Sequence, residues 1–317
     1  MKWDLGLNLY SKKSIIFEPG QLNSPEFRRV IAENKFHIYL VCKRKKIYFK
    51  SCERKEGKNE IVLYYLNDQH EKVNLTFSNQ SIYFIDSWSD GQYRITVNDS
   101  HRILVDDYKL INLLHSYNGD LKSKGENDGL ASDLEVLYVG QAFGRNKQRT
   151  IDYRLSNHEK VQKIALDILK LGSNEEVIII GLTVDTSDIK TSFALSDSKT
   201  VAPTTENLKQ ILTKSKNRLS KGQEVTVYEA SLIKYFRPNL NIEYKETFPS
   251  KDFISYNELY KIAFEYSAME VNTEEIGVRL YSTQAPARKY QHSQYFPLET
   301  DSDKATLFEY LYELNSK

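Results

Sequence analysis

Apolar and polar residues alternate along the first third of the chain. Residues 36–105 contain short segments such as FHIYLVC, EIVLYYL and QYRITV, in which β-branched and aromatic residues recur at alternate positions. A period of two is typical of strands with one buried face. Asp90 and Gly91 separate two of these segments, and glycine supplies the positive φ that tight hairpin turns require. The pattern predicts an antiparallel meander within a β-rich N-terminal domain over residues 1–117.

The alternation stops at residues 118–133. This segment carries three glycines among polar residues and offers little apolar surface for burial. Ordering such a segment costs conformational entropy that no buried surface offsets. We therefore expect a flexible linker or an expanded loop between two domains.

Strand and helix patterns alternate after residue 134. Short apolar runs indicate strands, and apolar positions three and four residues apart indicate helices. We expect an α+β fold, in which residues 134–250 form a small antiparallel sheet flanked by helices and residues 251–317 form an α+β C-terminal extension. The expected elements of the first of these regions are strands over 134–140 and 176–184, helices over 151–170, 205–219 and 225–236, and a short extended piece over 239–246.

Composition and cysteine content describe a globular protein in a reducing environment. The apolar fraction is 40%, the charged fraction is 27% and the formal net charge is +1, which argues against a disordered or fibrous chain. Cys42 and Cys52 are too few for a disulfide framework or a four-cysteine zinc site. The longest apolar run, over residues 177–184, is far shorter than the ~20 residues of a membrane helix, and a secretory signal pattern is not visible. These features predict a cytoplasmic protein that is not anchored in a membrane.

Positive charge is concentrated locally although the total is neutral. Residues 141–163 hold six Lys or Arg residues against two acids, and residues 207–221 hold five with no acid. Electrostatic attraction depends on the local field, so a polyanionic partner is compatible with this total. Solvated helix faces are the commoner explanation for any single run of charge.

Arg154 and His158 lie four residues apart on the helix expected over 151–170. This spacing places both side chains on one helix face, where they are able to contact a single anion. Tyr138 ends the preceding strand just before Gly140, and its hydroxyl would reach the sheet edge near that anion. Surface charge and cross-strand packing are the commoner roles for such residues.

Glu229 occupies the apolar face of a predicted helix. Leu232, Ile233 and Phe236 follow it at three, four and seven residues. Burying an ionised carboxylate is costly unless it is paired or binds a cation. The sequence therefore predicts either a salt bridge to an arginine or a metal ion at Glu229.

Three segments in this order resemble the GIY-YIG endonuclease superfamily over residues 134–245. They are LYVGQA, DYRLSNH and, about seventy residues later, EASLIKYFRPNLN. In this resemblance, Tyr138, Val139 and Gly140 match the YIG element. The remaining matches are Arg154 to the phosphate-contacting arginine, His158 to the histidine one turn later, Glu229 to the metal-binding glutamate, and Asn241, or less closely Asn239, to the closing asparagine.

The resemblance implies a metal-dependent endonuclease that hydrolyses phosphodiester bonds. It implies Mg²⁺, or Mn²⁺, on Glu229 and a phosphate clamp at Arg154. It also implies that Tyr138 helps to activate the nucleophile and that His158 orients or protonates the substrate. DNA is a more favoured substrate than RNA, and restriction of foreign DNA or defence against it is a fitting context.

Further positions are expected to bind the substrate or a partner. Gly140 and Asn241 belong to the matched motifs, and the basic loop would contact the nucleic-acid backbone without reading its sequence. The N-terminal domain would serve recognition or bind a protein partner. The cations of the basic loop are Arg145, Lys147 and Arg149.

The first tyrosine strand of the family is missing from its usual place before the YIG element. The segment GDLKSKGENDGLASDLE contains no tyrosine, and the nearest upstream tyrosines are Tyr108 and Tyr117, in a predicted helix. Either an expanded hairpin loop displaces the first motif, or the site is degenerate. A catalytically degenerate nucleic-acid-binding or regulatory module is therefore the alternative function.

Overall fold

Strands dominate the described part of the chain. The computed structural model describes residues 2–79, 83–89, 92–97, 101–106, 110, 133–142, 151–156, 162–164, 166–167, 174–193, 219–242, 245 and 266–297. The expected α+β fold is wrong, because these residues form several small sheets and one half-barrel with few helices. The helices described are η1 (Pro19–Asn23), α1 (Pro25–Glu33), α3 (Ile151–Ser156) and α6 (Lys221–Phe236).

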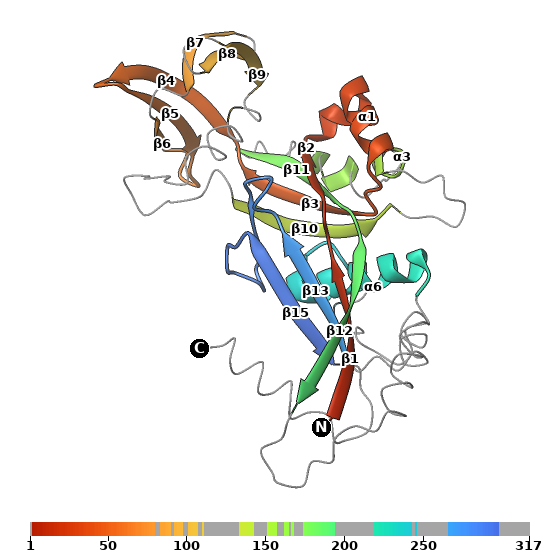
Figure 1. Ribbon diagram of the computed structural model, residues 1–317. Coiled ribbons are helices and arrows are strands. Elements are labelled where there is room, and N and C mark those ends of the chain that lie inside the picture. Colours follow the sequence, from red (N-terminus) through yellow and green to blue (C-terminus); the bar gives the residue numbers. More distant parts are fainter. Residues whose placement is uncertain are drawn as a thin grey trace.

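A five-stranded sheet lies at the centre of the molecule (Figure 1). Strand β3 is its middle strand and pairs antiparallel with β10 on one side and β11 on the other. The outer strands are β14, which is parallel to β10, and β2, which is antiparallel to β11. The bounds are β14 Arg279–Tyr281, β10 Asp133–Gln141, β3 Ile38–Lys45, β11 Glu175–Leu182 and β2 Ser14–Phe17.

The central place of β3 corrects the expected meander. The segment FHIYLVC does not pair with the strands that follow it but supplies β3. Residues 38–42 are all buried, and a strand that is apolar on both faces requires cover on both faces. Segments from the expected N-terminal, central and C-terminal regions therefore share one sheet, since β14 pairs with β10.

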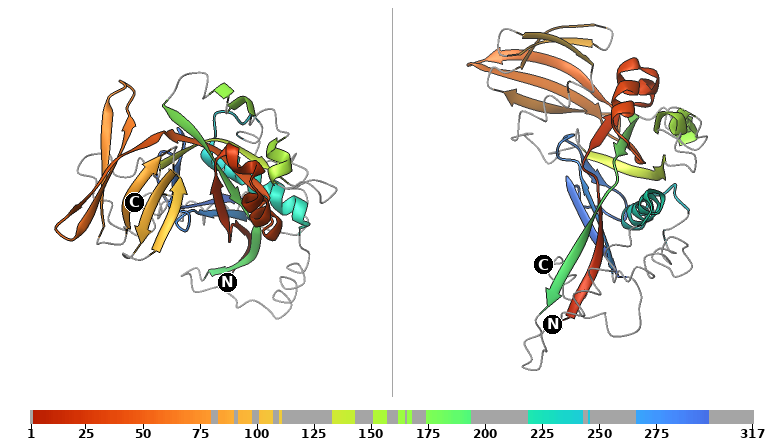
Figure 2. Two further views of the ribbon diagram at one scale, coloured as in Figure 1. Left: turned by 90° about the horizontal axis from the view of Figure 1, so that it is seen from above. Right: turned by 45° about the vertical axis from the view of Figure 1, so that its right-hand side comes forward.

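Two strands of the central sheet are connected directly along the chain to strands of a second sheet. Strand β2 follows β1 (Lys2–Tyr10), and β11 is followed by β12 (Asp185–Phe193). Strand β1 pairs with β12 and also with β13 (Tyr266–Asn272), which pairs with β15 (Gln291–Pro297). The right-hand view of Figure 2 shows α6 beside strands of both sheets. Side chains from both sheets and from α6 form one apolar core.

The other face of the central sheet is covered by the short helices. Side chains from η1, α1 and α3 pack on Tyr39, Val41 and Ile179 and form a second core. The central sheet is therefore a middle layer between α6 on one face and the η1, α1 and α3 helices on the other.

Two three-stranded sheets lie between β3 and β10 in the sequence and form one end of the molecule (Figure 1). They have their own apolar core, built around Ile61, Phe77, Tyr83 and Ile95. This part of the expected meander is therefore an insertion into the pair β3–β10, called the insert below. Its strands are β4 (Ile47–Lys55), β5 (Lys58–Leu66), β6 (Lys72–Asn79), β7 (Tyr83–Ser89), β8 (Gln92–Val97) and β9 (His101–Asp106).

Two smaller features complete the fold. The segments GVRLYS and QYFPL join different sheets, because β14 pairs with β10 whereas β15 pairs with β13. A single bridge joins Leu280 to Lys289. Among the helices of the described residues, none is long and apolar enough to cross a membrane.

Candidate active site

Tyr39 and Tyr138 lie side by side on one face of the central sheet. Their ring centroids are 6.1 Å apart, at an interplanar angle of 35°. The pairing of β10 with β3 shifts register between Val136 and Tyr138, and such a bulge re-aims the side chains that follow it. Leu137 and Tyr138 consequently pack on the same core, which brings Tyr138 beside Tyr39.

Gly140 makes room for both tyrosines. It lies opposite Tyr39 in the β3–β10 ladder. A Cβ atom built on Gly140 would lie 2.5 Å from the Tyr39 hydroxyl oxygen and 2.9 Å from the Tyr138 ring. The ring of Tyr39 therefore crosses β10 at a point where only a glycine fits.

Arg154 reaches the same hydroxyl from α3. The helix is fixed to the core by Ile151 and Leu155, which are buried. Arg154 is partly exposed and donates a hydrogen bond to the Tyr39 hydroxyl. Helix α3 thus presents a guanidinium group beside the tyrosine pair, where it remains partly open to solvent.

Glu229 approaches from α6 and is buried, with 8% of its surface exposed. Most residues of α6 from Val225 to Phe236 are buried, because the helix packs against side chains of both sheets. The carboxylate of Glu229 lies close enough to Tyr39 to act on its ionisation. A buried acid, an arginine and two tyrosines therefore share one site, contributed by β3, β10, α3 and α6.

The environment of Tyr39 favours its neutral phenol. Burial raises the pKa of Tyr39 far above its ordinary value, and Tyr138 and Glu229 raise it further. Arg154 opposes these effects through its charge and its hydrogen bond. Tyr39 is therefore a hydrogen-bonding group at neutral pH and loses its proton only if further positive charge reaches the site.

Asn241 attaches the end of α6 to β10. Its Oδ1 accepts a hydrogen bond from the Val139 amide, and its Nδ2 donates one to the Val139 carbonyl, both at 2.8 Å. The amide of Leu240 donates to the Leu137 carbonyl at 3.1 Å. Asn241 is buried whereas Asn239 is exposed. The amide group of Asn241, expected to bind substrate, thus completes the edge of β10.

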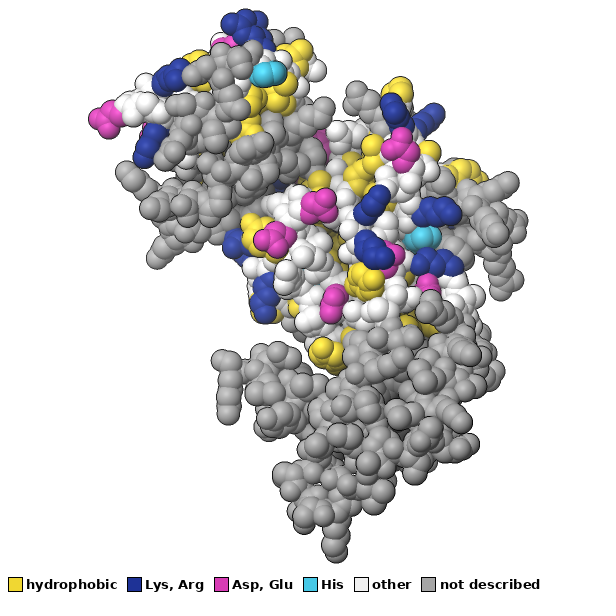
Figure 3. Space-filling view, viewed as in Figure 1, with side chains coloured by type: hydrophobic (Ala, Val, Ile, Leu, Met, Phe, Trp, Pro, Cys, Tyr) yellow, Lys and Arg dark blue, Asp and Glu magenta, His cyan; other side chains and the backbone are white. Residues whose placement is uncertain are grey.

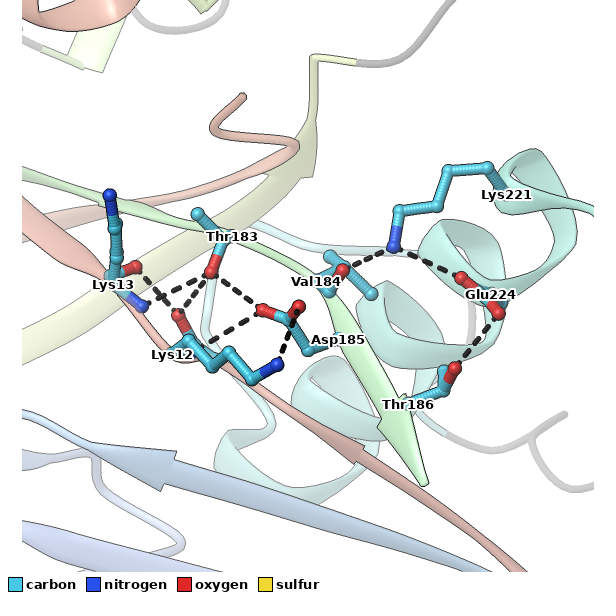
Figure 4. A network of polar contacts seen from close by, with 9 residues as sticks. Lys12, Lys13, Thr183, Val184, Asp185, Thr186, Lys221 and Glu224 are labelled. Carbon is cyan, nitrogen blue, oxygen red and sulfur yellow. Dashed lines mark hydrogen bonds and ion pairs between the residues drawn. The ribbon is translucent and has the colours of Figure 1, made fainter. Parts of the chain in front are cut away.

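The start of α6 is fixed at the bend between the two sheets. Figure 4 shows this polar network, in which Lys221 donates to the Val184 carbonyl and pairs with Glu224 at 3.0 Å. Thr186 of β12 donates to Glu224 at 3.0 Å. Ser220 caps the helix through a capping box with Gln223. With both ends of α6 held, the position of Glu229 relative to Tyr39 is defined.

Lysines gather around the same bend and form a basic surface. Figure 3 shows lysine and arginine side chains clustered between α1 and the start of α6. Burial, together with the nearby charges of Lys221 and Lys35, lowers the pKa of His37 to about 4. The surface is formed by Lys12, Lys13, Lys35 and Lys221, all of which are exposed.

The structure brings together four of the residues expected at the site, Tyr138, Gly140, Arg154 and Glu229. The other predicted positions, namely His158, Arg145, Lys147 and Arg149, lie outside the described residues, as do residues 118–132 and most of the helix expected over 205–219.

Tyr39 is the site residue that the sequence pattern did not reveal. It is the second residue of β3 and follows His37 and Ile38. The insert separates it from the YIG element by almost a hundred residues, so a search close to that element does not find it. The signal available was a tyrosine within an apolar strand.

Glu229 is suited to hold a hard divalent cation. Within the described ranges, no cluster of three or more His, Cys, Asp or Glu side chains forms a ready-made metal site. Mg²⁺ commonly uses one or two carboxylates and completes its shell with waters and substrate phosphates. A single buried carboxylate near Tyr39 is compatible with that mode of binding.

Comparison of the chain with protein-family models, with characterised proteins and with solved structures finds no match. The function of the site is therefore inferred from Tyr39, Tyr138, Arg154 and Glu229 themselves.

Proposed function

We propose that this protein is a metal-dependent endonuclease of the GIY-YIG type. The observation that carries the proposal is the surroundings of Tyr39, which lies against Tyr138, accepts a hydrogen bond from Arg154 and is near enough to Glu229 for its charge to act on the phenol. These residue types are the ones that the resemblance implies, and the HIY segment of β3 offers a tyrosine for the first motif. The strand that carries it pairs directly with the strand that carries YVG.

Each side chain has a role that follows from its chemistry. Arg154 would bind the scissile phosphate, because its planar fork of donors matches two phosphate oxygens. Tyr138, or a water that it orients, would take the proton of the nucleophile. Tyr39, which is fully buried, would hold Tyr138 and Arg154 in position by packing and hydrogen bonding. Glu229 would hold Mg²⁺ or Mn²⁺, which supplies electrostatic stabilisation of the leaving oxygen when bound.

The substrate that we propose is DNA, contacted through its backbone by the basic surface. Lys12 and Lys13 lie between β1 and β2, Lys35 lies just before β3, and Lys221 begins α6, the helix that carries Glu229. Exposed lysines add affinity through the phosphates and read no sequence. A cytoplasmic location and a context in restriction or defence belong to this proposal.

An inactive nucleic-acid-binding module is the second candidate function. The burial and raised pKa of Tyr39 favour it, because a tyrosine held as a buried neutral phenol supplies the site with neither a base nor a substrate contact. The lack of a tyrosine strand shortly before Tyr138 no longer supports an inactive module, since Tyr39 provides a tyrosine beside Tyr138.

Cleavage of plasmid DNA by a carboxylate variant separates the two candidates. We expect Mg²⁺-dependent cleavage by the wild type and a loss of at least about a hundredfold in Glu229→Gln, because glutamine keeps the shape but not the charge. DNA binding measured in EDTA should be unchanged. The matched control is Glu224→Gln, on the same helix but bonded to Lys221 and Thr186, which should cleave normally.

Melting curves of the variants show whether a loss of cleavage comes from a loss of fold. If Glu229→Gln and Arg154→Ala both melt far below the wild type while Glu224→Gln does not, the two residues form a structural ion pair and the catalytic proposal fails. If the wild type binds DNA but never cleaves it in Mg²⁺ or Mn²⁺, the second candidate is correct.

A further inference from the structure

The outer face of one sheet of the insert carries two stacked tyrosines. Tyr48 of β4 and Tyr64 of β5 are opposite each other in the antiparallel ladder. Their ring centroids are 5.1 Å apart and their planes differ by 21°. Their inner-face neighbours Ile47, Leu63 and Tyr65 fill the core of the insert. The stacked pair therefore projects away from that core.

Lysines lie over both ends of the stacked pair. The Lys72 ammonium is 4.9 Å from the ring centroid of Tyr64, and the Lys46 ammonium is 5.6 Å from that of Tyr48. Both lysines are exposed and both tyrosines are partly exposed. These four residues are called the tyrosine stack below. In it, each ring has over it a cation on a flexible chain.

A third lysine extends the positive charge along the same sheet. Lys50 is exposed, and its ammonium donates to Asn74 Oδ1 at 3.2 Å. Asn74 lies opposite Tyr64 in the ladder between β5 and β6. Of the neighbouring carboxylates, Asp68 is paired with Lys45, and Glu71 accepts a hydrogen bond from the side-chain amide of Asn67. The exposed positive charge beside the rings is therefore available to an anionic partner.

We propose that the tyrosine stack binds an unpaired nucleic-acid strand. A base is able to take the place of Lys46 or Lys72 over the exposed ring face, because base–aromatic stacking is stronger than an exposed cation–π contact. The displaced ammonium stays within reach of the phosphate that follows the base. The surface thus offers the aromatic platforms and the cations that single-strand binding uses in general.

The chemistry selects an unpaired strand over other anions. A duplex hides its base faces inside its own stack, and an acidic peptide would use the lysines but not the rings. Stacking and phosphate pairing involve groups that DNA and RNA share, so strands of either sugar should bind. The inference does not require nuclease activity, because it concerns the insert and not the site on the central sheet.

Binding of a fluorescent oligothymidine strand of about twelve nucleotides tests the inference, since single-strand sites span roughly 4–16 nucleotides. The full chain is titrated in EDTA so that cleavage is prevented. The variant Tyr48→Val/Tyr64→Val keeps strand-forming residues and should weaken binding at least about tenfold. Binding of the same sequence as a duplex should be weaker than binding of the strand and should change little in this variant.

Two control variants separate the stack from tyrosines and lysines in general. Tyr10→Val removes a tyrosine of β1 that also lies near a lysine, with the Lys12 ammonium 5.8 Å from its ring centroid, but that lies outside the insert. Lys55→Gln removes a cation of β4 that pairs with Glu53 and Glu60. Both should bind the strand like the wild type.

The lysine variants decide the question if the double tyrosine variant fails to fold. Lys46→Gln/Lys72→Gln should lower the slope of log affinity against log salt by about one to two, as expected for lost phosphate contacts. An unchanged strand affinity in a folded Tyr48→Val/Tyr64→Val variant would overturn the inference. An unchanged salt slope in the lysine variant, or equal competition by polyglutamate, would overturn it as well.

Discussion

Gly140 and Tyr39 are in contact across the β3–β10 ladder so closely that a Cβ atom on the glycine would lie 2.5 Å from the tyrosine hydroxyl. The tyrosine ring is buried on all sides, so it has little room to move. We expect Gly140→Ala to lower the free energy of unfolding by about 1–3 kcal/mol, as overpacking does, and to reduce cleavage. Thermal melting of Gly20→Ala provides the control, since a Cβ at Gly20 meets nothing within 4 Å. Equal melting temperatures for the two variants would contradict the packing.

Arg154→Lys should lose most of the cleavage activity while the protein stays folded. Lysine keeps the charge but lacks the planar fork that binds two phosphate oxygens. Arg154 is partly exposed, so the change in stability should remain within about 1 kcal/mol. Single-turnover cleavage and a melting curve of the same preparation measure both effects. Normal cleavage by Arg154→Lys would show that no bidentate phosphate clamp forms here.

Asn241→Ala and Asn239→Ala should differ sharply in stability although the two residues are neighbours. The side chain of Asn241 satisfies both the amide and the carbonyl of Val139, and its loss leaves these buried groups unpaired. Each unsatisfied group costs about 1–3 kcal/mol, so Asn241→Ala should be strongly destabilised. Asn239 is exposed, and its replacement should change little. Chemical denaturation of both variants checks this, and similar midpoints would show that the link to β10 is weak.

His292 should make the protein less stable in acid. Burial lowers its pKa to about 4. Nε2 donates to the Lys289 carbonyl at 3.0 Å, which leaves Nδ1 to accept from Tyr235 at 2.9 Å. The folded pKa is below the unfolded value of 6.5, so stability is complete above about pH 6.5 and is lost as the pH falls towards 4.

Replacement of His292 by phenylalanine tests this pH dependence. His292→Phe loses two hydrogen bonds and should start from a lower stability at pH 8. Between pH 6.5 and 4 its decline should be smaller than that of the wild type by up to about 3 kcal/mol. Urea unfolding at each pH gives the two curves. Parallel curves would mean that His292 contributes nothing to the acid sensitivity.

The sequence predicted the local elements around the site better than their arrangement. The strand carrying Tyr138, the helix carrying Glu229 and the burial of that carboxylate are all found, because each depends on the spacing of apolar residues nearby. The partner of Tyr138 could not be predicted in this way. Tyr39 lies beside Tyr138 because two strands that are distant in the sequence pair. The alternation of apolar residues does not specify which strands pair with each other.

The role of Asn241 shows a second limit of the sequence pattern. An asparagine after a proline fits a turn, a substrate contact or a link to an edge strand equally well. The choice depends on where the edge of β10 lies relative to the end of α6, and the bulge at Leu137 sets that position. Such a bulge leaves no clear mark in the alternation of apolar residues.

The insertion between β3 and β10 has a consequence for the order in which the chain becomes structured during synthesis. The strands of the insert pair with immediate neighbours, and such local pairing is fast. Strand β3 must wait for β10 and β11 to leave the ribosome, and β1 must wait still longer for β13. We therefore expect the newly made chain to hold a finished insert beside an apolar β3 with both edges unpaired, a state prone to aggregation. Pulse-labelled hydrogen exchange during refolding should protect β5 before β3, and the reverse order would contradict this.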